Sequence, residues 1–163
     1  MEAEKEISFF EIIQSFNSLN IQYLIIGRRA VILYGAPVMT ADYDFWINSN
    51  DKEKSLTLLQ NLGCELSKDI RTRSPIVFAY SGTKKYDLFF HKSITNTEGQ
   101  IITFDRCYIN SDIIESKKDK IYFRVPSIDD LIKLKKIRSY NAKDEQDIEF
   151  LLQAKKILNK KNT

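Results

Sequence analysis

The order of apolar and polar side chains divides the chain into segments of two kinds. Apolar residues at three-residue spacing among Glu and Gln predict an amphipathic helix over residues 4–17. The same periodicity, ended by Gly, Pro or Asn, predicts helices over residues 28–34, 52–61 and 143–158. Short apolar or alternating runs predict strands over residues 23–26, 42–47, 76–80, 85–90, 104–109 and 121–125, with residues 91–100 as a polar loop.

A further helix is predicted after Pro126. Ser127 with Asp130 three residues later resembles a capping box, a pairing that starts many helices. The order of helix, strand, helix, strand, helix, several strands and two helices predicts a mixed α/β sheet flanked by helices. We expect residues 1–125 to form this core and residues 126–163 to form a helical extension packed on it, as one structural domain.

Composition narrows the classes of protein without naming a function. Lys and Arg number 25 against 22 for Asp and Glu, and this mild excess permits nucleic-acid binding without arguing for it. Because no apolar run is long enough to span a bilayer and the N-terminus does not resemble a secretory signal, we expect a cytoplasmic protein with no membrane partner. Cys64 and Cys107 predict buried reduced thiols, and the single His91 excludes a histidine-cluster metal site.

The residues with the clearest chemical potential lie between positions 24 and 47. Asp42 and Asp44 are two positions apart on a predicted strand, so their carboxylates share one face. Two such charges repel unless a cation lies between them, and a hard divalent ion suits oxygen donors. Asp87, on a later apolar strand, is a natural third carboxylate. These residues predict a site for Mg²⁺ or Mn²⁺ made of Asp42, Asp44 and Asp87.

A glycine turn precedes this acidic pair. Gly27 ends a predicted strand and lets the backbone approach a ligand closely. The helix that follows offers free N–H groups at its N-terminus to a phosphate, and Arg28 and Arg29 stand at the same turn as cationic donors. The turn is therefore a candidate phosphate-binding site.

The acidic residues also have structural interpretations. Asp42 and Asp44 could face solvent on an edge strand, where no cation is needed. Asp87 could end a strand or form an ion pair with Lys84 or Lys85.

The basic residues have similar alternatives. Arg28 and Arg29 could be helix-surface cations, Lys143 and Asp147 could pair on a helix surface at i,i+4 spacing, and His91 could be an incidental loop residue. A solvated helix face is the structural alternative for Lys133, Lys135, Lys136 and Arg138.

The order of these residues resembles the nucleotidyltransferase superfamily, which has the polymerase-beta-like fold. That family carries a strand, a Gly-Gly or Gly-Ser turn, a helix, a strand with two aspartates, and a third acid on a later strand. The spelling Thr-x-Asp-x-Asp is similar to a bacterial branch that includes abortive-infection and toxin–antitoxin nucleotidyltransferases. The matching stretches are Ile25-Ile26-Gly27-Arg28-Arg29-Ala30, Tyr34-Gly35 and Thr40-Ala41-Asp42-Tyr43-Asp44.

The C-terminal part is similar to the same branch. The resemblance spans about residues 20–152. Its C-terminal motifs are Val125-Pro126-Ser127-Ile128-Asp129-Asp130-Leu131-Ile132-Lys133-Leu134-Lys135 and Lys143-Asp144-Glu145-Gln146-Asp147-Ile148. One departure is Arg28, where the family usually has a second Gly or a Ser.

The resemblance implies a metal-dependent enzyme that moves NMP from an NTP to a hydroxyl acceptor on RNA, a protein or a small molecule. It implies that Asp42 and Asp44 bind Mg²⁺ carrying the NTP, and that Asp87 joins a second metal or deprotonates the acceptor. Lys135, with Arg28 or Arg29, would steady the phosphate charge. The second-tier site candidates are Thr40, Lys143 and Asp144.

The resemblance further implies a toxin–antitoxin or phage-defence setting, with an antitoxin protein as a partner. A second hypothesis keeps the fold but not the turnover: a catalytically degenerate module that acts by binding a nucleotide or a partner protein. Arg28 favours this second hypothesis, and the intact pair of Asp42 and Asp44 favours the enzyme.

Overall fold

A mixed sheet forms the centre of the molecule. The computed structural model describes residues 5–137 and 141–161. The sheet has five strands in the order β1-β2-β5-β4-β3. β2 and β5 run parallel, and the other neighbouring strands run antiparallel. The strands are β1 (Tyr23–Ile26), β2 (Tyr43–Ile47), β3 (Glu65–Leu66), β4 (Ile76–Ser81) and β5 (Lys84–Phe89).

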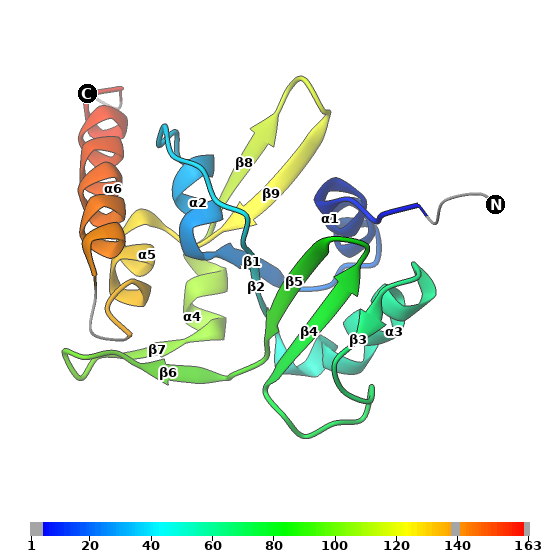
Figure 1. Ribbon diagram of the computed structural model, residues 1–163. Helices are drawn as coiled ribbons and strands as arrows, with labels where there is room; N and C mark the ends of the chain where they lie inside the picture. Colours follow the sequence, from blue (N-terminus) through cyan, green and yellow to red (C-terminus); the bar gives the residue numbers. More distant parts are fainter. Residues whose placement is uncertain (1–4, 138–140, 162–163) are drawn as a thin grey trace.

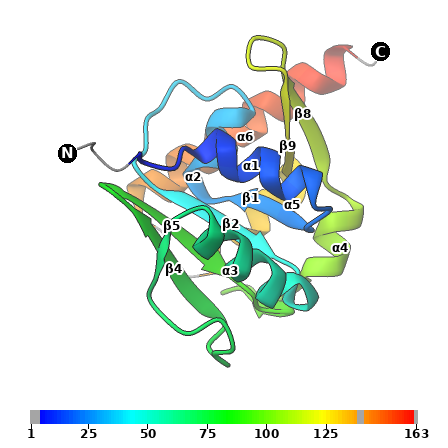
Figure 2. The ribbon, with the colours of Figure 1, turned by 90° about the vertical axis from the view of Figure 1, so that its right-hand side faces the viewer.

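Helices flank this sheet, which confirms the predicted fold class. Figure 1 shows α1 (Phe9–Ser18) and α3 (Lys52–Asn61) on one side of the sheet, and Figure 2 looks onto these two helices. α2 (Gly27–Leu33) follows β1 directly. The other side of the sheet carries α4 (Phe104–Ile109), α5 (Ile128–Leu134) and α6 (Ala142–Lys161).

The alternation of side chains along β2 joins the two layers. Phe45 is fully buried and contacts Phe16 of α1, with ring centroids 5.5 Å apart. The next residue, Trp46, points to the other face and packs edge-on against Phe104 of α4. Because both side chains of this pair are in the core, the register of β2 is fixed, and Asp44 lies on the Trp46 face.

α1 begins at Phe9 and not at residue 4 as the spacing predicted. The hydroxyl of Ser8 accepts a hydrogen bond from the Glu11 backbone N–H, and the Glu11 carboxylate accepts one from the Ser8 N–H. This capping box satisfies two N–H groups that lack partners in the first turn and so fixes the helix start.

The strand predicted over residues 104–109 is wrong, because these residues form α4. The run is rich in aromatic and β-branched residues, which favoured a strand. The Thr103 hydroxyl favours a helix instead, because it accepts a hydrogen bond from the Arg106 N–H and caps the first turn. α4 then buries Phe104 and Cys107.

Two hairpins complete the structure. β6 (Ser93–Thr95) pairs with β7 (Ile101–Thr103), so residues 91–100 are partly strand rather than wholly loop. β8 (Asp112–Ser116), which the sequence pattern did not predict, pairs with β9 (Ile121–Val125). Phe123 of β9 stacks on Phe9 of α1 and ties this second hairpin to the core.

The C-terminal helices begin as the sequence predicted. The Ser127 hydroxyl accepts a hydrogen bond from the Asp130 N–H at the start of α5. Cys64 and Cys107 are buried free thiols. Among the described helices, none has the length and apolar character needed to cross a bilayer.

Candidate active site

Two aspartates lie side by side at the centre of the sheet. Asp44 of β2 and Asp87 of β5 are direct neighbours in the parallel register, close enough for the charge of Asp87 to act on Asp44. Asp42 lies just before β2 and adds a third negative charge. Since β2 has β1 on one side and β5 on the other, the alternative that these acids stand on an edge strand is wrong.

The environment of Asp44 disfavours its charged form. Burial is the largest cause, followed by the charges of Asp87 and Asp42, and together they raise the pKa of Asp44 to about 7. The ammonium of Lys135 acts in the opposite direction. A cation bound beside Asp44 would therefore stabilise its ionised form.

Gly27 is the residue on which Asp44 packs. Its φ is +71°, in the left-handed region that favours glycine. A Cβ at this position would lie 2.5 Å from Oδ2 of Asp44, closer than any two such atoms can approach. A side chain at this position would therefore strain the backbone and force the Asp44 carboxylate to move.

A cavity of about 630 Å³ opens over these residues, and we name it the Gly27 cavity. It brings together most of the residues that the sequence singled out, from the loop before β2, the start of α2, the end of α5 and the start of α6. Its lining residues are Gly27, Arg28, Met39, Thr40, Ala41, Asp42, Asp44, Lys135, Asn141, Lys143, Asp144 and Asp147.

A second cavity of about 410 Å³ adjoins the first, and we name it the hairpin cavity because the turn between β4 and β5 forms one wall. Ala41 and Asp42 line both cavities, and Asp87 lines only the second. The lining of the hairpin cavity is Ala41, Asp42, Tyr43, Thr83, Lys84, Lys85 and Asp87. The acidic group therefore lies at the boundary between two cavities.

A buried carboxylate that sequence reasoning missed organises the wall of the Gly27 cavity. Asp147 of α6 has a side chain only 1% exposed. Its Oδ1 lies 3.2 Å from Nε of Arg28, and its Oδ2 lies 2.8 Å from Nζ of Lys135. The interpretation of Asp147 as a surface partner of Lys143 is therefore wrong.

The ion pair with Asp147 fixes the position of the Arg28 side chain. Its guanidinium also donates to the Gln146 side chain at 2.7 Å, so it is fixed against α6. The side chain stands in the wall and leaves the cavity open. Lys135 keeps its ammonium at the same wall, within electrostatic reach of Asp44.

Arg29 contacts the segment that precedes β2. Its guanidinium donates to the backbone carbonyls of Thr40 and Asp42, at 3.0 and 3.3 Å. It also lies 4.2 Å over the Tyr43 ring. Arg29 thus holds the segment that carries Asp42, and it does not appear among the residues that line the Gly27 cavity.

The second-tier candidates Thr40, Lys143 and Asp144 all line the Gly27 cavity. The Thr40 hydroxyl accepts a hydrogen bond from the Asp42 N–H at 3.1 Å. Asp144 is buried and exchanges hydrogen bonds with Asn141, which starts α6. Lys143 is exposed and lines the Gly27 cavity. Arg138 lies outside the described residues.

Asp87 and His91 make contacts that their structural interpretations anticipated. Nζ of Lys85 lies 3.5 Å from Oδ1 of Asp87, as the ion-pair alternative proposed. The His91 carbonyl accepts a hydrogen bond from the Trp46 indole, and His91 lines neither cavity. His91 is therefore a structural residue here.

The donor set fits a hard divalent cation. Across residues 5–137 and 141–161, no three acidic, histidine or cysteine side chains are arranged to hold a metal ion by themselves. Mg²⁺ does not need such a cage, because it is commonly bound by one or two carboxylates together with substrate phosphates. Asp44 and Asp87 supply two adjacent carboxylates. Burial, followed by the charges of Asp87 and Asp42, raises the pKa of Asp44, and a cation beside it would relieve this penalty on the charged form.

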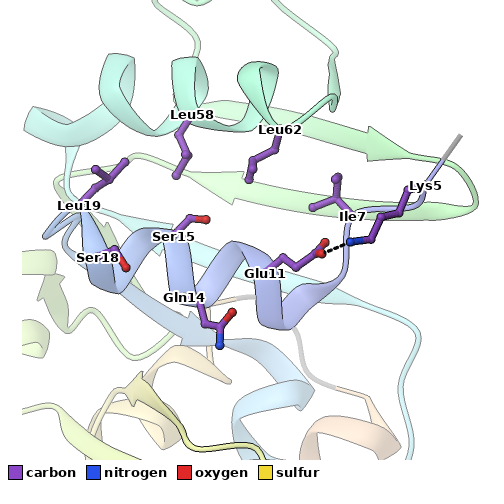
Figure 3. A pocket seen from close by; sticks show the side chains of 9 residues that line it. All are labelled: Lys5, Ile7, Glu11, Gln14, Ser15, Ser18, Leu19, Leu58 and Leu62. Atoms are coloured by element: carbon purple, nitrogen blue, oxygen red, sulfur yellow. Dashed lines mark hydrogen bonds and ion pairs between the residues drawn. The ribbon is translucent and has the colours of Figure 1, made fainter.

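Another hollow, of about 490 Å³, lies between α1 and α3 on the far side of the sheet. Figure 3 shows Leu58 of α3 and Leu62, which directly follows α3, facing α1, with Leu19 at one end. The charged groups in its lining, Lys5 and Glu11, already pair with each other at 2.7 Å. The Gly27 and hairpin cavities, which hold the acids, are therefore the candidate active site.

No family model and no curated protein matches the sequence. Among solved structures, the lincomycin-bound lincosamide antibiotic adenylyltransferase LnuA matches with a TM-score of 0.65 and 14% identity, over 92% of this chain and 99% of that one. The antibiotic-resistance factor ANT(2'')-Ia matches with a TM-score of 0.58 and 11% identity, over 88% and 80%.

An antigenic nucleotidyltransferase-like protein from Paracoccidioides brasiliensis matches with a TM-score of 0.57 and 17% identity, over 87% of this chain and 72% of that one. At such identities the likeness concerns the fold. It agrees with the resemblance carried by the glycine turn, the paired aspartates and the C-terminal motifs. The chain has a nucleotidyltransferase-like fold.

Proposed function

We propose that this protein is a metal-dependent nucleotidyltransferase that moves NMP from an NTP to a hydroxyl acceptor. The observation that carries the proposal is the position of Asp44. It lies against Gly27, is the direct cross-strand neighbour of Asp87, and lines a cavity that also contains the ammonium of Lys135. That combination supplies carboxylates for a cation and a cation for phosphates at one place.

The residues have separable tasks. Asp44 and Asp87, with Asp42 beside them, would hold Mg²⁺ or Mn²⁺. When bound, the metal would neutralise charge on the triphosphate and on the departing pyrophosphate. Lys135 and the backbone at Gly27 bind phosphate oxygens in the Gly27 cavity. Asp147 keeps Lys135 at the cavity wall.

The transfer itself exchanges one bond for another. The acceptor oxygen forms a bond to the α-phosphorus of the NTP, and the bond from that phosphorus to pyrophosphate breaks. Asp87, which faces the hairpin cavity, takes the hydroxyl proton. Metal binding needs Asp44 ionised, so it is coupled to release of a proton when the pH is below the raised pKa of Asp44.

The biological setting that we propose is toxin–antitoxin or phage defence, with an antitoxin protein as a partner. This part rests on the motif resemblance alone. LnuA is named as an antibiotic adenylyltransferase and ANT(2'')-Ia as an antibiotic-resistance factor. These names support NMP transfer by this fold in general.

The test supplies each labelled NTP with Mg²⁺ or Mn²⁺ and a panel of RNA, protein and small-molecule acceptors. We expect label transfer by the native protein and none by the Asp42→Ala/Asp44→Ala variant. Asp129→Ala, at an exposed position outside both cavities, serves as the matched control and should keep full activity. NTP binding without transfer to any acceptor would support the degenerate module instead.

A further inference from the structure

Arg28 and Lys135 share one buried carboxylate at the wall of the Gly27 cavity. Oδ1 of Asp147 lies 3.2 Å from Nε of Arg28, and Oδ2 lies 2.8 Å from Nζ of Lys135. The side chain of Asp147 is 1% exposed, against 18% for Arg28 and 11% for Lys135. The group therefore has two positive charges for one negative charge, so one cation can leave while Asp147 keeps a partner.

The two cations of this group are held in different ways. The Arg28 guanidinium donates to Asp147 and also to the Gln146 side chain, at 2.7 Å, so two neighbouring residues of α6 hold it. Lys135 directly follows α5, and its ammonium ends a flexible four-carbon chain. The arginine is therefore suited to stay at Asp147, and the lysine is suited to move.

A phosphate in the Gly27 cavity would give the Lys135 ammonium a second place to bind. Lys135 lines this cavity, and its positive charge already acts on Asp44 there. If Lys135 were the sole partner of Asp147, its movement to a phosphate would leave a carboxylate buried without a counter-charge, which is strongly unfavourable. Arg28 removes that penalty because it stays beside Asp147.

We infer that Arg28 is a positioning residue, which keeps the charge of Asp147 neutralised while Lys135 moves from Asp147 to a phosphate of the NTP. Arg28 itself stays against α6 and makes no contact with the NTP. The inference rests on the proposed function, which supplies the NTP. In the sequence Arg28 favoured the degenerate module, whereas in this role it supports nucleotide binding.

The first measurement is the affinity for the donor nucleotide, which needs no acceptor and no turnover. Equilibrium dialysis of the full-length chain with Mg²⁺ and each labelled non-hydrolysable NTP analogue gives the dissociation constant. We expect Arg28→Ala to bind the analogue about tenfold more weakly, which is within the usual range of coupling between residues of one ion-pair network. Arg28→Lys can still pair with Asp147 and should recover most of this loss.

Arg124 provides a matched control for the loss of an arginine. Like Arg28 it is half-buried and donates to a side chain, here the hydroxyl of Ser111 at 3.1 Å, but it lines neither the Gly27 cavity nor the hairpin cavity. Arg124→Ala should bind the analogue as the native chain does. Circular dichroism and urea unfolding verify that each variant is folded under the conditions of the binding measurement.

A double-mutant cycle with Asp147 separates this role from a direct contact with the phosphate. Asp147→Asn removes the charge that Arg28 neutralises, so in this background Arg28→Ala should change the affinity by less than about twofold. An equal loss in both backgrounds would mean that Arg28 binds the phosphate itself. No loss in either would mean a merely structural role, and tighter binding by Arg28→Ala would mean that Arg28 obstructs the cavity. Each of these three results overturns the inference.

The native chain distinguishes failure of the inference from failure of the proposed function. If it binds no NTP analogue in the presence of Mg²⁺ and labels no acceptor, the proposed function fails and the inference fails with it. If it binds the analogue and transfers label, but the cycle shows no coupling between Arg28 and Asp147, the inference alone fails.

Discussion

At the scale of single residues, Asp44 links charge to stability. Its pKa is about 7 in the folded protein against an ordinary value of 3.8. A carboxyl whose pKa is raised on folding favours the folded state below the lower value and loses that contribution as the pH rises through the higher one. Native stability should therefore fall between about pH 4 and pH 7 because of this group.

The asparagine side chain in the Asp44→Asn variant cannot ionise, so this variant should not lose folding stability as the pH rises. We expect the variant to be more stable than the native chain at about pH 8, by up to about 4 kcal/mol, with the difference vanishing near pH 4. Urea unfolding at several pH values measures it. A stability difference that is the same at every pH would contradict the assignment, and Asp129→Asn at an exposed site should show no comparable trend.

Gly27 and Gly99 make a matched pair for a second prediction. Both have positive φ, +71° and +77°, but only Gly27 has a neighbour where a Cβ would stand. Gly99→Ala should cost about 1 kcal/mol from backbone strain. Gly27→Ala should cost more and should also displace Asp44, so it should lose NTP-dependent activity. If the two variants matched in stability and activity, the contact with Asp44 would have no functional weight.

At the scale of elements, α6 is joined to α2 and α5 through one buried acid. Removing Asp147 leaves the charges of Arg28 and Lys135 without their partner. We expect Asp147→Ala to lower the free energy of unfolding by about 3 kcal/mol or more. Asp129→Ala breaks the exposed pair with Lys155 and should cost at most about 0.5 kcal/mol. Thermal or urea unfolding distinguishes them, and equal small losses would count against a structural role for the network.

Elements were predictable where a local signal was strong. The bounds of α3 match the prediction because apolar periodicity and Gly63 agree, although the Asp51 carboxylate accepts a hydrogen bond from the Gln22 N–H and does not cap the helix. The misassigned α4 had its own local signal in Thr103, whose cap was outweighed by an aromatic run. Asp147 belongs to a C-terminal motif of the resemblance, but nothing local marked it as buried: its partner Arg28 is 119 positions away, and at i,i+4 from Lys143 it looked like a surface residue.

The candidate site was predictable in part for the same reason. The pairing of Asp42 with Asp44 and the glycine turn are short-range patterns that can be read directly. The orientation of Arg28 and Arg29 is a tertiary result, because it depends on carbonyls and carboxylates that the fold brings near them. The parallel register that sets Asp87 beside Asp44 also comes from the whole sheet.

At the scale of the whole molecule, the donor should stabilise the folded state. The Gly27 cavity exists only when α2, α5, α6 and the loop before β2 are assembled, so its ligand binds the folded chain alone. Mg²⁺ with a non-hydrolysable NTP analogue at a hundred times its dissociation constant should add about 2.7 kcal/mol. Thermal unfolding should show this shift for the native chain and not for Asp42→Ala/Asp44→Ala, whereas an equal shift in both would place the ligand elsewhere.

The position of Asp147 has a consequence for the order of synthesis. A ribosome makes the aspartate-bearing strands early and α6 last among the described elements. A nascent chain that has not yet extruded Asp147 holds its acids on the sheet, but Arg28 and Lys135 have no buried carboxylate to orient them. If the proposed function holds, we expect the growing polypeptide to lack activity until α6 has left the exit tunnel and docked.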